Sequence, residues 1–293
     1  MNSFLLIDFG ASYIKSIHYD KKSNSLSRPE TRKSPLYETD VLQKNVIKNE
    51  ILNLIDYYGK IDAVMMCSIL GGHYVDDTYY SWKNKDTESH HNACLLNDIF
   101  NNSDINGIKC YSSYGDTDCV VKSVNLEDSD LLVNLGTGSQ VISNSKRISF
   151  IPSGRVLNVF NTFFNSLGLD MFDKFSQLEL IDLEKSSLEF DLNIFSKAFR
   201  FNGGGVINNI LENNFNVDNF IASLFKNYIE QYIEIINSYQ GIKKIYLTGG
   251  ISKKYKLISN YISHKTNIKT VVNSMEHEDT HIGLVNIINS EIL

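Results

Sequence analysis

The chain has 293 residues, of which 42% are hydrophobic, 11% aromatic and 21% charged, so it can bury a substantial core in one large domain or two smaller ones. Its 28 Lys and Arg against 34 Asp and Glu give a formal charge of −6, which argues against a nucleic-acid partner. No run approaches 18 apolar residues, which excludes a membrane-spanning helix, and the N-terminus lacks the basic region of a signal peptide. The cysteines form no CxxC pair, as is typical of a cytoplasmic protein with reduced thiols: Cys67, Cys94, Cys110 and Cys119.

The first half of the chain alternates between strand and helix patterns. A buried strand at Phe4–Asp8 is ended by Gly10, and Tyr13–Tyr19 returns antiparallel to it. Apolar residues at helical spacing predict a helix over Val41–Tyr58, which Gly59 ends. The remaining predicted elements are a strand at Ala63–Leu70 closed by Gly71-Gly72, a short helix at Asn92–Phe100, a strand at Ile108–Ser112 and a helix at Asp116–Leu126.

The second half begins with a buried strand at Leu131–Leu135, which leads into a glycine-rich turn and a returning strand at Gln140–Ser143. The longest helical pattern of the chain lies at Val217–Tyr239. The other predicted elements are strand character at Ile148–Val159, a strand at Lys244–Thr248, a helix at Lys253–Ser263, a strand at Ile268–Val272 and a helix at Thr280–Ile292. This order predicts an α/β protein.

The first strand ends in a turn that is suited to phosphate. Gly10 allows the backbone to approach an anionic group, and Ser12 and Lys15 can donate to phosphate oxygens. Asp8, at the end of the strand, can hold a hydrated Mg²⁺. Taken alone, a hairpin that needs only a glycine explains these residues better.

Two later glycine turns offer similar chemistry. Gly136, Thr137, Gly138 and Ser139 place two hydroxyls and several backbone N–H groups in one turn, which is either a phosphate nest or a tight turn that needs positive φ angles. Gly249 and Gly250 follow a strand and open a helix. They let a flat ring lie against the backbone, although a simple chain reversal explains the pair alone.

Asp116 follows a strand and a glycine and precedes the glycine-rich turn by one short helix. A carboxylate at this place suits a general base that takes the proton of an incoming hydroxyl. The alternative is a helix N-cap, a role for which Asp118 competes.

The order of these motifs is Asp-x-Gly-x-Ser, Gly-Asp, Gly-Thr-Gly-Ser and Gly-Gly, and it resembles the actin, hexokinase and Hsp70 superfamily. Within that superfamily the chain looks most like the FGGY carbohydrate kinases, and their sedoheptulokinase branch in particular. The likeness lies in Tyr114–Val120 with Asp130–Val141, Ile151–Val159, Phe201–Phe215, Ile245–Ser252 and Glu278–Gly283. It implies two ribonuclease-H-like (actin-like ATPase) domains, residues 1–128 and 129–293, with a nucleotide cleft between them.

The resemblance also implies an activity, cofactors and site residues. The activity is transfer of a phosphoryl group from ATP, with Mg²⁺, to a hydroxyl of a small sugar, a ketose such as sedoheptulose. Asp116 is then the general base and Asp8 orders Mg²⁺. The phosphates contact Gly10, Ser12, Lys15, Gly136, Thr137, Gly138 and Ser139; the adenosine contacts Gly249, Gly250 and Gly204; and the sugar contacts His73 and Trp82.

The chain departs from the family pattern on the sugar side. The family's W-x-D-x-R element reads Trp82–Asp86 here, with Asn84 where Asp is usual, so Trp82 either stacks on a sugar or caps the core. Few residues separate Trp82 from Asp116, which predicts a shortened first domain. The alternatives are an N-acetylhexosamine or BadF-like kinase, whose G-D-E-G-S stretch is absent from Phe150–Leu169, and a catalytically degenerate nucleotide-binding regulator. The sequence carries no signal for the oligomeric state.

Overall fold

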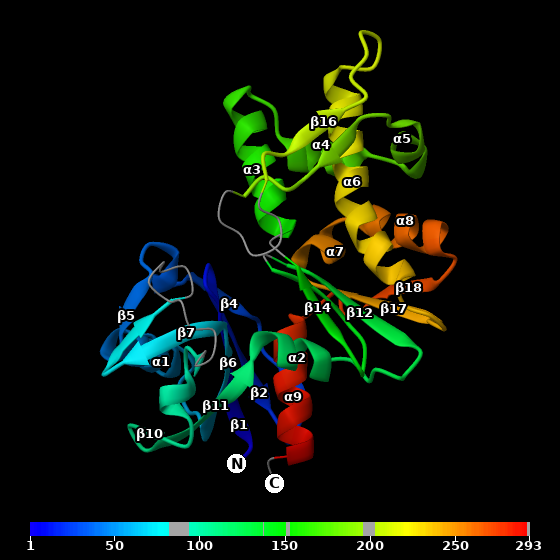
Figure 1. The fold of residues 1–293 in the computed structure, drawn as a ribbon. Helices are drawn as coiled ribbons and strands as arrows, with labels where there is room; N and C mark the ends of the chain where they lie inside the picture. Colours follow the sequence, from blue (N-terminus) through cyan, green and yellow to red (C-terminus); the bar gives the residue numbers. More distant parts are fainter. Residues whose placement is uncertain (82–93, 137, 151–152, 196–202, 292–293) are drawn as a thin grey trace. The chain divides into compact units, whose positions relative to one another are not determined.

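The computed structural model describes residues 1–81, 94–136, 138–150, 153–195 and 203–291, and the structural statements that follow concern these residues. The chain forms two compact units (Figure 1). The first contains residues 1–125 and 276–293, and the second contains residues 126–275. The division after residue 125 lies near the expected one after residue 128. The C-terminal segment, in contrast, groups with the first unit and not with the second, where the sequence had placed it.

The first unit is built on a sheet with the strand order β10-β11-β6-β1-β2-β3, and β4 also pairs with β2. Its strands β1, β6 and β11 run parallel, while β2 is antiparallel to β1. The carboxyl ends of the three parallel strands therefore share one edge of the sheet, where ligands bind in open α/β sheets. The bounds are β1 Ser3–Phe9, β2 Tyr13–Asp20, β3 Ser25–Leu26, β4 Glu30–Lys33, β6 Ala63–Ser68, β10 Asp104–Ile105 and β11 Ile108–Gly115.

Both faces of this sheet are covered, which explains the continuous apolar run of β6. One face packs on α1 (Lys44–Tyr58) through Ile47, Ile51 and Leu54, all buried. The other face packs on the C-terminal helix α9 (Asp279–Glu291), whose Leu284, Ile287 and Ile288 are buried against the sheet. A strand that is buried on both faces needs apolar residues at every position rather than at alternate ones.

A second, smaller sheet has the order β5-β8-β7-β9 and corrects three expectations from the sequence. The predicted helix at Val41–Tyr58 begins only at Lys44. Gly71 and Gly72, expected to end a strand, lie inside β7. The Tyr79 ring occupies the space that a Cβ on Gly72 would need, so a glycine is required at this position of the strand. The described part of the predicted helix Asn92–Phe100 is β9 and a 3₁₀ turn, η3. The bounds are β5 Val41–Gln43, β7 Leu70–Val75, β8 Thr78–Tyr80, β9 Cys94–Leu95 and η3 Asp98–Phe100.

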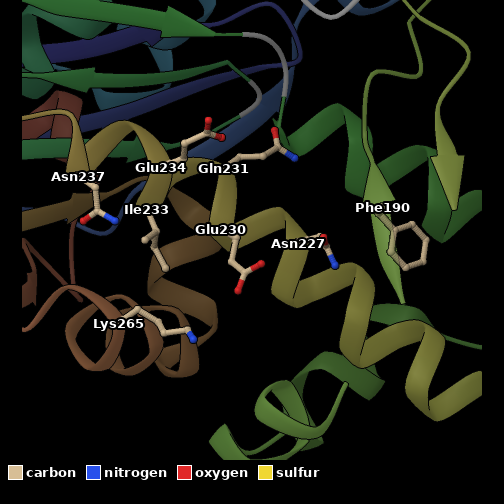
Figure 2. Close-up of a pocket in the computed structure, with 8 residues that line it drawn as sticks. All are labelled: Phe190, Asn227, Glu230, Gln231, Ile233, Glu234, Asn237 and Lys265. Carbon is tan, nitrogen blue, oxygen red and sulfur yellow. The ribbon is translucent and has the colours of Figure 1, made fainter. Parts of the chain in front are cut away.

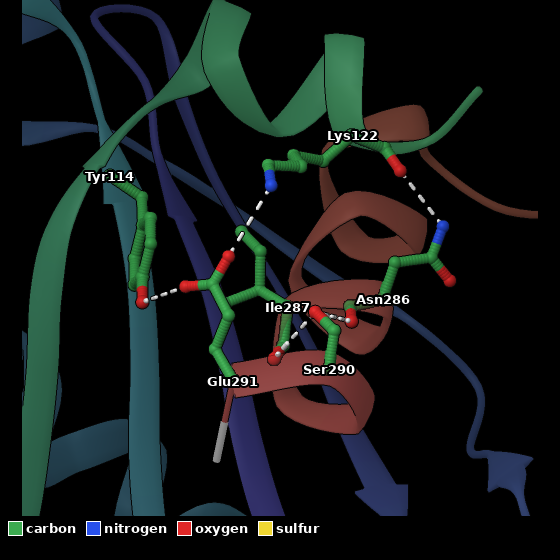
Figure 3. Close-up of polar contacts among 6 residues, drawn as sticks. All are labelled: Tyr114, Lys122, Asn286, Ile287, Ser290 and Glu291. Atoms are coloured by element: carbon green, nitrogen blue, oxygen red, sulfur yellow. Dashed lines mark hydrogen bonds and ion pairs between the residues drawn. The ribbon is translucent and has the colours of Figure 1, made fainter. Parts of the chain in front are cut away.

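Helix α9 joins the first unit because it lies directly on α2 (Asp116–Lys122). A Cβ on Gly283 would collide with the backbone of Cys119, so only glycine allows this close approach. Figure 3 shows the polar contacts near the end of α9: Lys122 pairs with Glu291 at 3.3 Å, and Asn286 donates to the carbonyl of Lys122 at 2.8 Å. Side-chain burial, close backbone packing and these contacts together hold residues 279–291 in the first unit.

The second unit repeats the topology of the first. Its sheet has the order β14-β13-β12-β17-β18, with β12, β17 and β18 parallel and β12, β13 and β14 joined antiparallel. In both units a run of antiparallel strands is followed by two parallel ones, which is the ribonuclease-H-like arrangement that the sequence predicted. The bounds are β12 Asp130–Leu135, β13 Ser139–Ile142, β14 Arg147–Phe150, β17 Lys244–Thr248 and β18 Lys269–Val272.

The helices of the second unit confirm one prediction and correct another. The long helix is present as α6. The predicted strand character over Ile148–Val159 is confirmed up to Phe150 and is wrong from Ser153 onward, because Val156, Leu157 and Phe164 place apolar residues at helical spacing on α3. The predicted helix at Lys253–Ser263 is two helices that meet at Tyr255. The remaining bounds are α3 Ser153–Ser166, α4 Met171–Gln177, α5 Leu180–Lys185, β15 Glu189–Asp191, β16 Val206–Asn208, α6 Val217–Asn237, α7 Gly250–Lys254 and α8 Lys256–Thr266. Within the described part of the chain, no helix is long and apolar enough to cross a membrane.

Candidate functional site

Two of the predicted site residues, Asp8 and Asp116, lie at the same edge of the first sheet. Asp8 pairs with Cys67 of β6 near the end of β1, and Ser68 pairs with Gly115 at the end of β11. Asp116 follows as the first residue of α2. The backbones of β1 and β11, where the two residues lie, are thus two strand spacings apart, roughly 10 Å.

The Asp8 carboxylate lies in an environment that disfavours its charge. Burial, and then the nearby charge of Asp116, raise its pKa to about 6, while Lys15 and a hydrogen bond from Thr280 act in the opposite direction. The Thr280 hydroxyl donates to Oδ2 of Asp8 at 2.9 Å. Carboxylate oxygens are ligands that Mg²⁺ prefers, so the donor chemistry of this edge fits the ion.

Mg²⁺ does not require a cage of protein ligands, since it keeps several waters and is usually held by one or two carboxylates together with substrate phosphates. Consistent with this, no group of three or more His, Cys, Asp or Glu side chains suited to a metal ion occurs among the described residues. Asp8 is therefore the residue that would hold the ion.

The turn after β1 is compact and firmly held. Gly10 donates its N–H to the carbonyl of Tyr13 at 3.1 Å, and a Cβ at Gly10 would lie 2.8 Å from that oxygen, so the turn requires a glycine. The carbonyl of Ser12 accepts from the N–H of Ser34 at 3.0 Å. Lys15 forms an ion pair with Glu278 at 2.9 Å, which means that a phosphate would have to share or displace this partner.

A buried histidine, His281, contacts the backbone of Lys15. His281 is fully buried, and burial lowers its pKa to about 4, so its ring is neutral at pH 7. Its Nε2 lies 3.2 Å from the carbonyl oxygen of Lys15 and therefore carries the proton and donates it to that oxygen. The sequence gave no reason to place His281 at the site, because the contact joins residues 266 positions apart.

Asp116 does not take the N-cap position that was its alternative role. The N-cap of α2 is Gly115, and Asp116 and Asp118 both lie in the first turn. Oδ1 of Asp116 accepts from the N–H of Thr117 at 2.6 Å and from its hydroxyl at 3.1 Å, which orients the carboxylate at the strand end. Leu95 of β9 lies beside Gly115, so the small sheet adjoins Asp116.

The glycine-rich turn of the second unit is only partly available to a phosphate. Gly136 and Gly138 lie in the turn, and the carbonyl of Gly136 accepts from the N–H of Gly154 at 3.2 Å; Thr137 lies outside the described residues. The hydroxyl of Ser139 is buried and hydrogen-bonded to that of Tyr232 at 2.7 Å. This hydroxyl therefore faces the core and does not take the phosphate contact that the sequence suggested for it.

The glycines assigned to adenosine differ in their surroundings. Gly249 has a φ of +89°, and a Cβ there would collide with the carbonyl of Leu135 and lie 2.9 Å from Oδ1 of Asn134. A glycine is therefore required here, because the chain passes close to the backbone of β12. Gly250 and Gly204 have open space where a Cβ would be, which leaves room beside their backbone.

On the sugar side, His73 lies in β7 and stacks on Tyr80 of β8, with ring centroids 5.3 Å apart and an interplanar angle of 17°. The two are register partners of the small sheet. Tyr80 was not among the predicted site residues. The turn at Asp76-Asp77 is typical of a β-hairpin, and a predicted hairpin could have indicated that Tyr80 lies beside His73. Trp82 lies outside the described residues.

A pocket of about 530 Å³ lies elsewhere in the second unit, along α6 and α8 (Figure 2). It contains none of the predicted site residues. It is lined by Phe190, Asn227, Glu230, Gln231, Ile233, Glu234, Asn237 and Lys265.

No protein-family model and no curated protein sequence matches the chain. Solved structures are similar over nearly its whole length. A xylulose kinase from Lactobacillus acidophilus has a TM-score of 0.68 at 14% identity, covering 99% of this chain and 89% of that one. A gluconate kinase from the same organism has a TM-score of 0.67 at 13% identity, covering 98% and 89%. The activator of a 2-hydroxyisocaproyl-CoA dehydratase from Clostridium difficile, solved with bound ADPNP, has a TM-score of 0.57 at 12% identity, covering 99% and 95%.

At these identities the likeness concerns the fold. It confirms the predicted α/β class, since these structures match the chain over nearly its whole length with TM-scores of 0.68 and 0.67. The chain has the two-unit α/β fold of the actin-like ATPases, in the form found in sugar kinases.

Proposed function

We propose that the chain is an ATP-dependent carbohydrate kinase that transfers the γ-phosphoryl group of ATP to a hydroxyl of a small sugar. The observation that carries this proposal is the pair of carboxylates, Asp8 and Asp116, at the carboxyl edge of the first sheet. The fold of the chain is one that a xylulose kinase and a gluconate kinase also have. Phosphoryl transfer needs little beyond positioning and neutralisation of charge, and these residues suit both needs.

Asp116 is the proposed general base. Its carboxylate is oriented by Thr117 and accepts the proton of the attacking sugar hydroxyl as that oxygen bonds to the γ-phosphorus and the bond from this phosphorus to the oxygen of the departing ADP breaks. Asp8 holds Mg²⁺ through its carboxylate. When bound, the ion neutralises charge on the phosphate oxygens.

The phosphate chain of ATP is held by the two glycine hairpins. In the first, the contacts come from the backbone of Gly10, from Ser12 and from Lys15 once it leaves Glu278. In the second, they come from the backbone around Gly136 and Gly138 and from Thr137. Ser139 contributes at most its main chain, because its hydroxyl is hydrogen-bonded to Tyr232. The adenosine lies against Gly249, Gly250 and Gly204.

The proposed acceptor is a ketose such as sedoheptulose. His73 donates or accepts a hydrogen bond with a sugar hydroxyl, and Trp82 stacks on the sugar face. The proposed compartment is the cytoplasm, in keeping with the free thiols of all four cysteines, which lie within the described residues.

The test uses the purified chain with Mg-ATP and a panel of sedoheptulose, xylulose, gluconate, glycerol and N-acetylglucosamine, with ADP release as the readout. At least one ketose should stimulate ADP release, and Asp116→Ala should abolish the stimulation. The proposal fails if no compound on the panel stimulates turnover and Asp116→Ala changes nothing.

A nucleotide-binding regulator is the second candidate, and the similarity to a dehydratase activator with bound ADPNP favours it. The same protein would then bind ATP without releasing ADP in response to a sugar. Titration calorimetry with ATP, run beside the sugar panel, separates the two functions. Stimulation by N-acetylglucosamine alone would instead support an N-acetylhexosamine kinase.

A further inference from the structure

Residues 278–281, at the start of α9, contact both members of one register pair in the β1–β2 hairpin. Asp8 and Lys15 lie directly opposite each other in that hairpin. Thr280 donates to Oδ2 of Asp8 at 2.9 Å, and Glu278 forms an ion pair with Lys15 at 2.9 Å. His281 donates to the carbonyl of Lys15 at 3.2 Å. Two of these contacts hold the charged side chains proposed for metal and phosphate, and the third holds the backbone of Lys15.

The contact between Thr280 and Asp8 is sheltered from water. Thr280 is 7% exposed and His281 is fully buried, whereas the ion pair of Lys15 with Glu278 is about one-third exposed on both sides, at 32% and 38%. A hydrogen bond to a carboxylate in a sheltered place restrains the side chain more than an exposed ion pair does, because water does not compete for its lone pairs. Of the two contacts that reach a charged side chain, the one from Thr280 is therefore the less exposed to water.

The helix that carries Thr280 has little freedom to move within the first unit. Gly283 lies against the backbone of Cys119, one turn after Asp116 in α2, and Leu284 and Ile288 are fully buried. The Thr280 hydroxyl is consequently fixed with respect to both β1 and α2.

We propose that Thr280 is a positioning residue whose hydroxyl fixes the orientation in which Asp8 presents its carboxylate to a divalent cation. The inference rests on the proposed function, in which Asp8 holds Mg²⁺. It goes beyond that function because none of the motifs in the sequence assigns a role to Thr280. Hydrogen-bonding partners of metal-ligating side chains commonly change metal affinity by 10–100-fold when they are removed.

The test is the affinity for Mn²⁺, used as a spectroscopic substitute for Mg²⁺ and measured by electron paramagnetic resonance with saturating ADP. Thr280→Val keeps the shape of the side chain and removes the donor, and it should weaken Mn²⁺ binding about tenfold or more. Thr280→Ser keeps the donor and should retain the wild-type affinity. Ser290→Ala is the matched control in the same helix, because among the described residues the Ser290 hydroxyl donates to the carbonyls of Asn286 and Ile287 in its own helix.

Two further measurements separate positioning from a general loss of structure. The affinity for ADP without metal and the unfolding temperature should be similar in all variants, and Thr280→Ala replaces Thr280→Val should the latter not fold. The inference is overturned if Thr280→Val binds Mn²⁺ as the wild type does, or if Thr280→Ser is as weak as Thr280→Val.

Asp8→Asn separates this inference from the proposed function. If Asp8→Asn loses Mn²⁺ and Thr280→Val does not, Asp8 keeps its proposed role and the positioning role is overturned. If neither variant affects Mn²⁺ binding, both are overturned. If Thr280→Val weakens Mn²⁺ binding while no sugar stimulates ADP release, the positioning role is supported and the kinase proposal fails.

Discussion

The β1–β2 and β12–β13 hairpins occupy equivalent places in the two sheets, yet their chemistry differs. The first presents a carboxylate and an ammonium group, Asp8 and Lys15, which are held by side chains of another element. Near its turn, the described polar side chains of the second are neutral: Asn134 donates to Gln140 at 2.8 Å and accepts from Thr248 of β17 at 3.3 Å, and Ser139 is hydrogen-bonded to Tyr232 of α6 at 2.7 Å.

Under the proposed function, the first hairpin acts through charged side chains, so substitutions there should change the chemistry and its dependence on pH. The second would act through its backbone, because the described side chains near its turn contact other side chains, so substitutions there should change stability first.

The largest effect is expected at the edge of the first sheet. Asp116→Asn removes the proposed base while keeping the shape of the side chain, and sugar-dependent ADP release should fall about 10²–10⁴-fold. The matched control is Asp118→Asn in the same helical turn, which should stay close to the wild-type rate. Equal losses in the two variants would mean that the helix start, and not a base, matters.

In the second unit, the largest effect should be on stability. Gly249→Ala places a methyl group against the carbonyl of Leu135 at a φ of +89°, which should destabilise the chain by about 3 kcal/mol or more. Gly250→Ala meets open space and should change the free energy of unfolding little. Urea unfolding of the two variants measures both, and equal stability would show that β12 and α7 do not approach each other as described.

The next effect concerns pH, where Asp8 and His281 act in opposite directions. The folded-state pKa of Asp8 is raised from 3.8 to about 6, so its stabilising contribution is complete below pH 3.8 and is lost as the pH rises through 6. The pKa of His281 is lowered from 6.5 to about 4, so its contribution is present above pH 6.5 and is lost as the pH falls through 4. Each contribution is about 3 kcal/mol, and the two largely cancel in the wild type.

Single substitutions should separate the contributions of Asp8 and His281 to the pH dependence of stability. Compared with the wild type, Asp8→Asn should lose stability more steeply as the pH falls from 6.5 to 4. His281→Gln should instead gain stability over the same interval, relative to the wild type. Unfolding free energies measured at several pH values test this, and parallel profiles for all three proteins would contradict the opposed contributions.

The smallest effect concerns the Ser139 hydroxyl and tests whether it packs in the core or contacts a phosphate. Ser139→Ala removes a buried hydrogen bond and should cost about 1 kcal/mol of stability, with Tyr232→Phe close to it. The affinity for ATP should be unchanged in both variants. A large loss of ATP affinity in Ser139→Ala alone would restore its hydroxyl as a phosphate contact and weaken the contrast between the hairpins.

Much of the fold was predictable because its signals are local. Apolar runs at Phe4–Asp8 and Leu131–Leu135 mark strands that are buried on both faces, and each is followed by a glycine. The strand character over Ile148–Val159 is correct up to Phe150 and was mistaken from Ser153 onward, because a short apolar run fits a strand and a buried helix equally well. Only its packing in the second unit distinguishes the two.

The sequence by itself determined which residue types stand at the strand ends, since Asp8 and Asp116 follow runs whose pattern can be read along the chain. The tertiary structure decided what surrounds them. Thr280 reaches Asp8 across 272 residues, α9 packs with the first unit, and Ser139 turns its hydroxyl toward Tyr232, 93 residues away. Periodicity reports which face of an element is buried, but the partner of a buried polar group is chosen by which distant element packs there, and no local pattern carries that information.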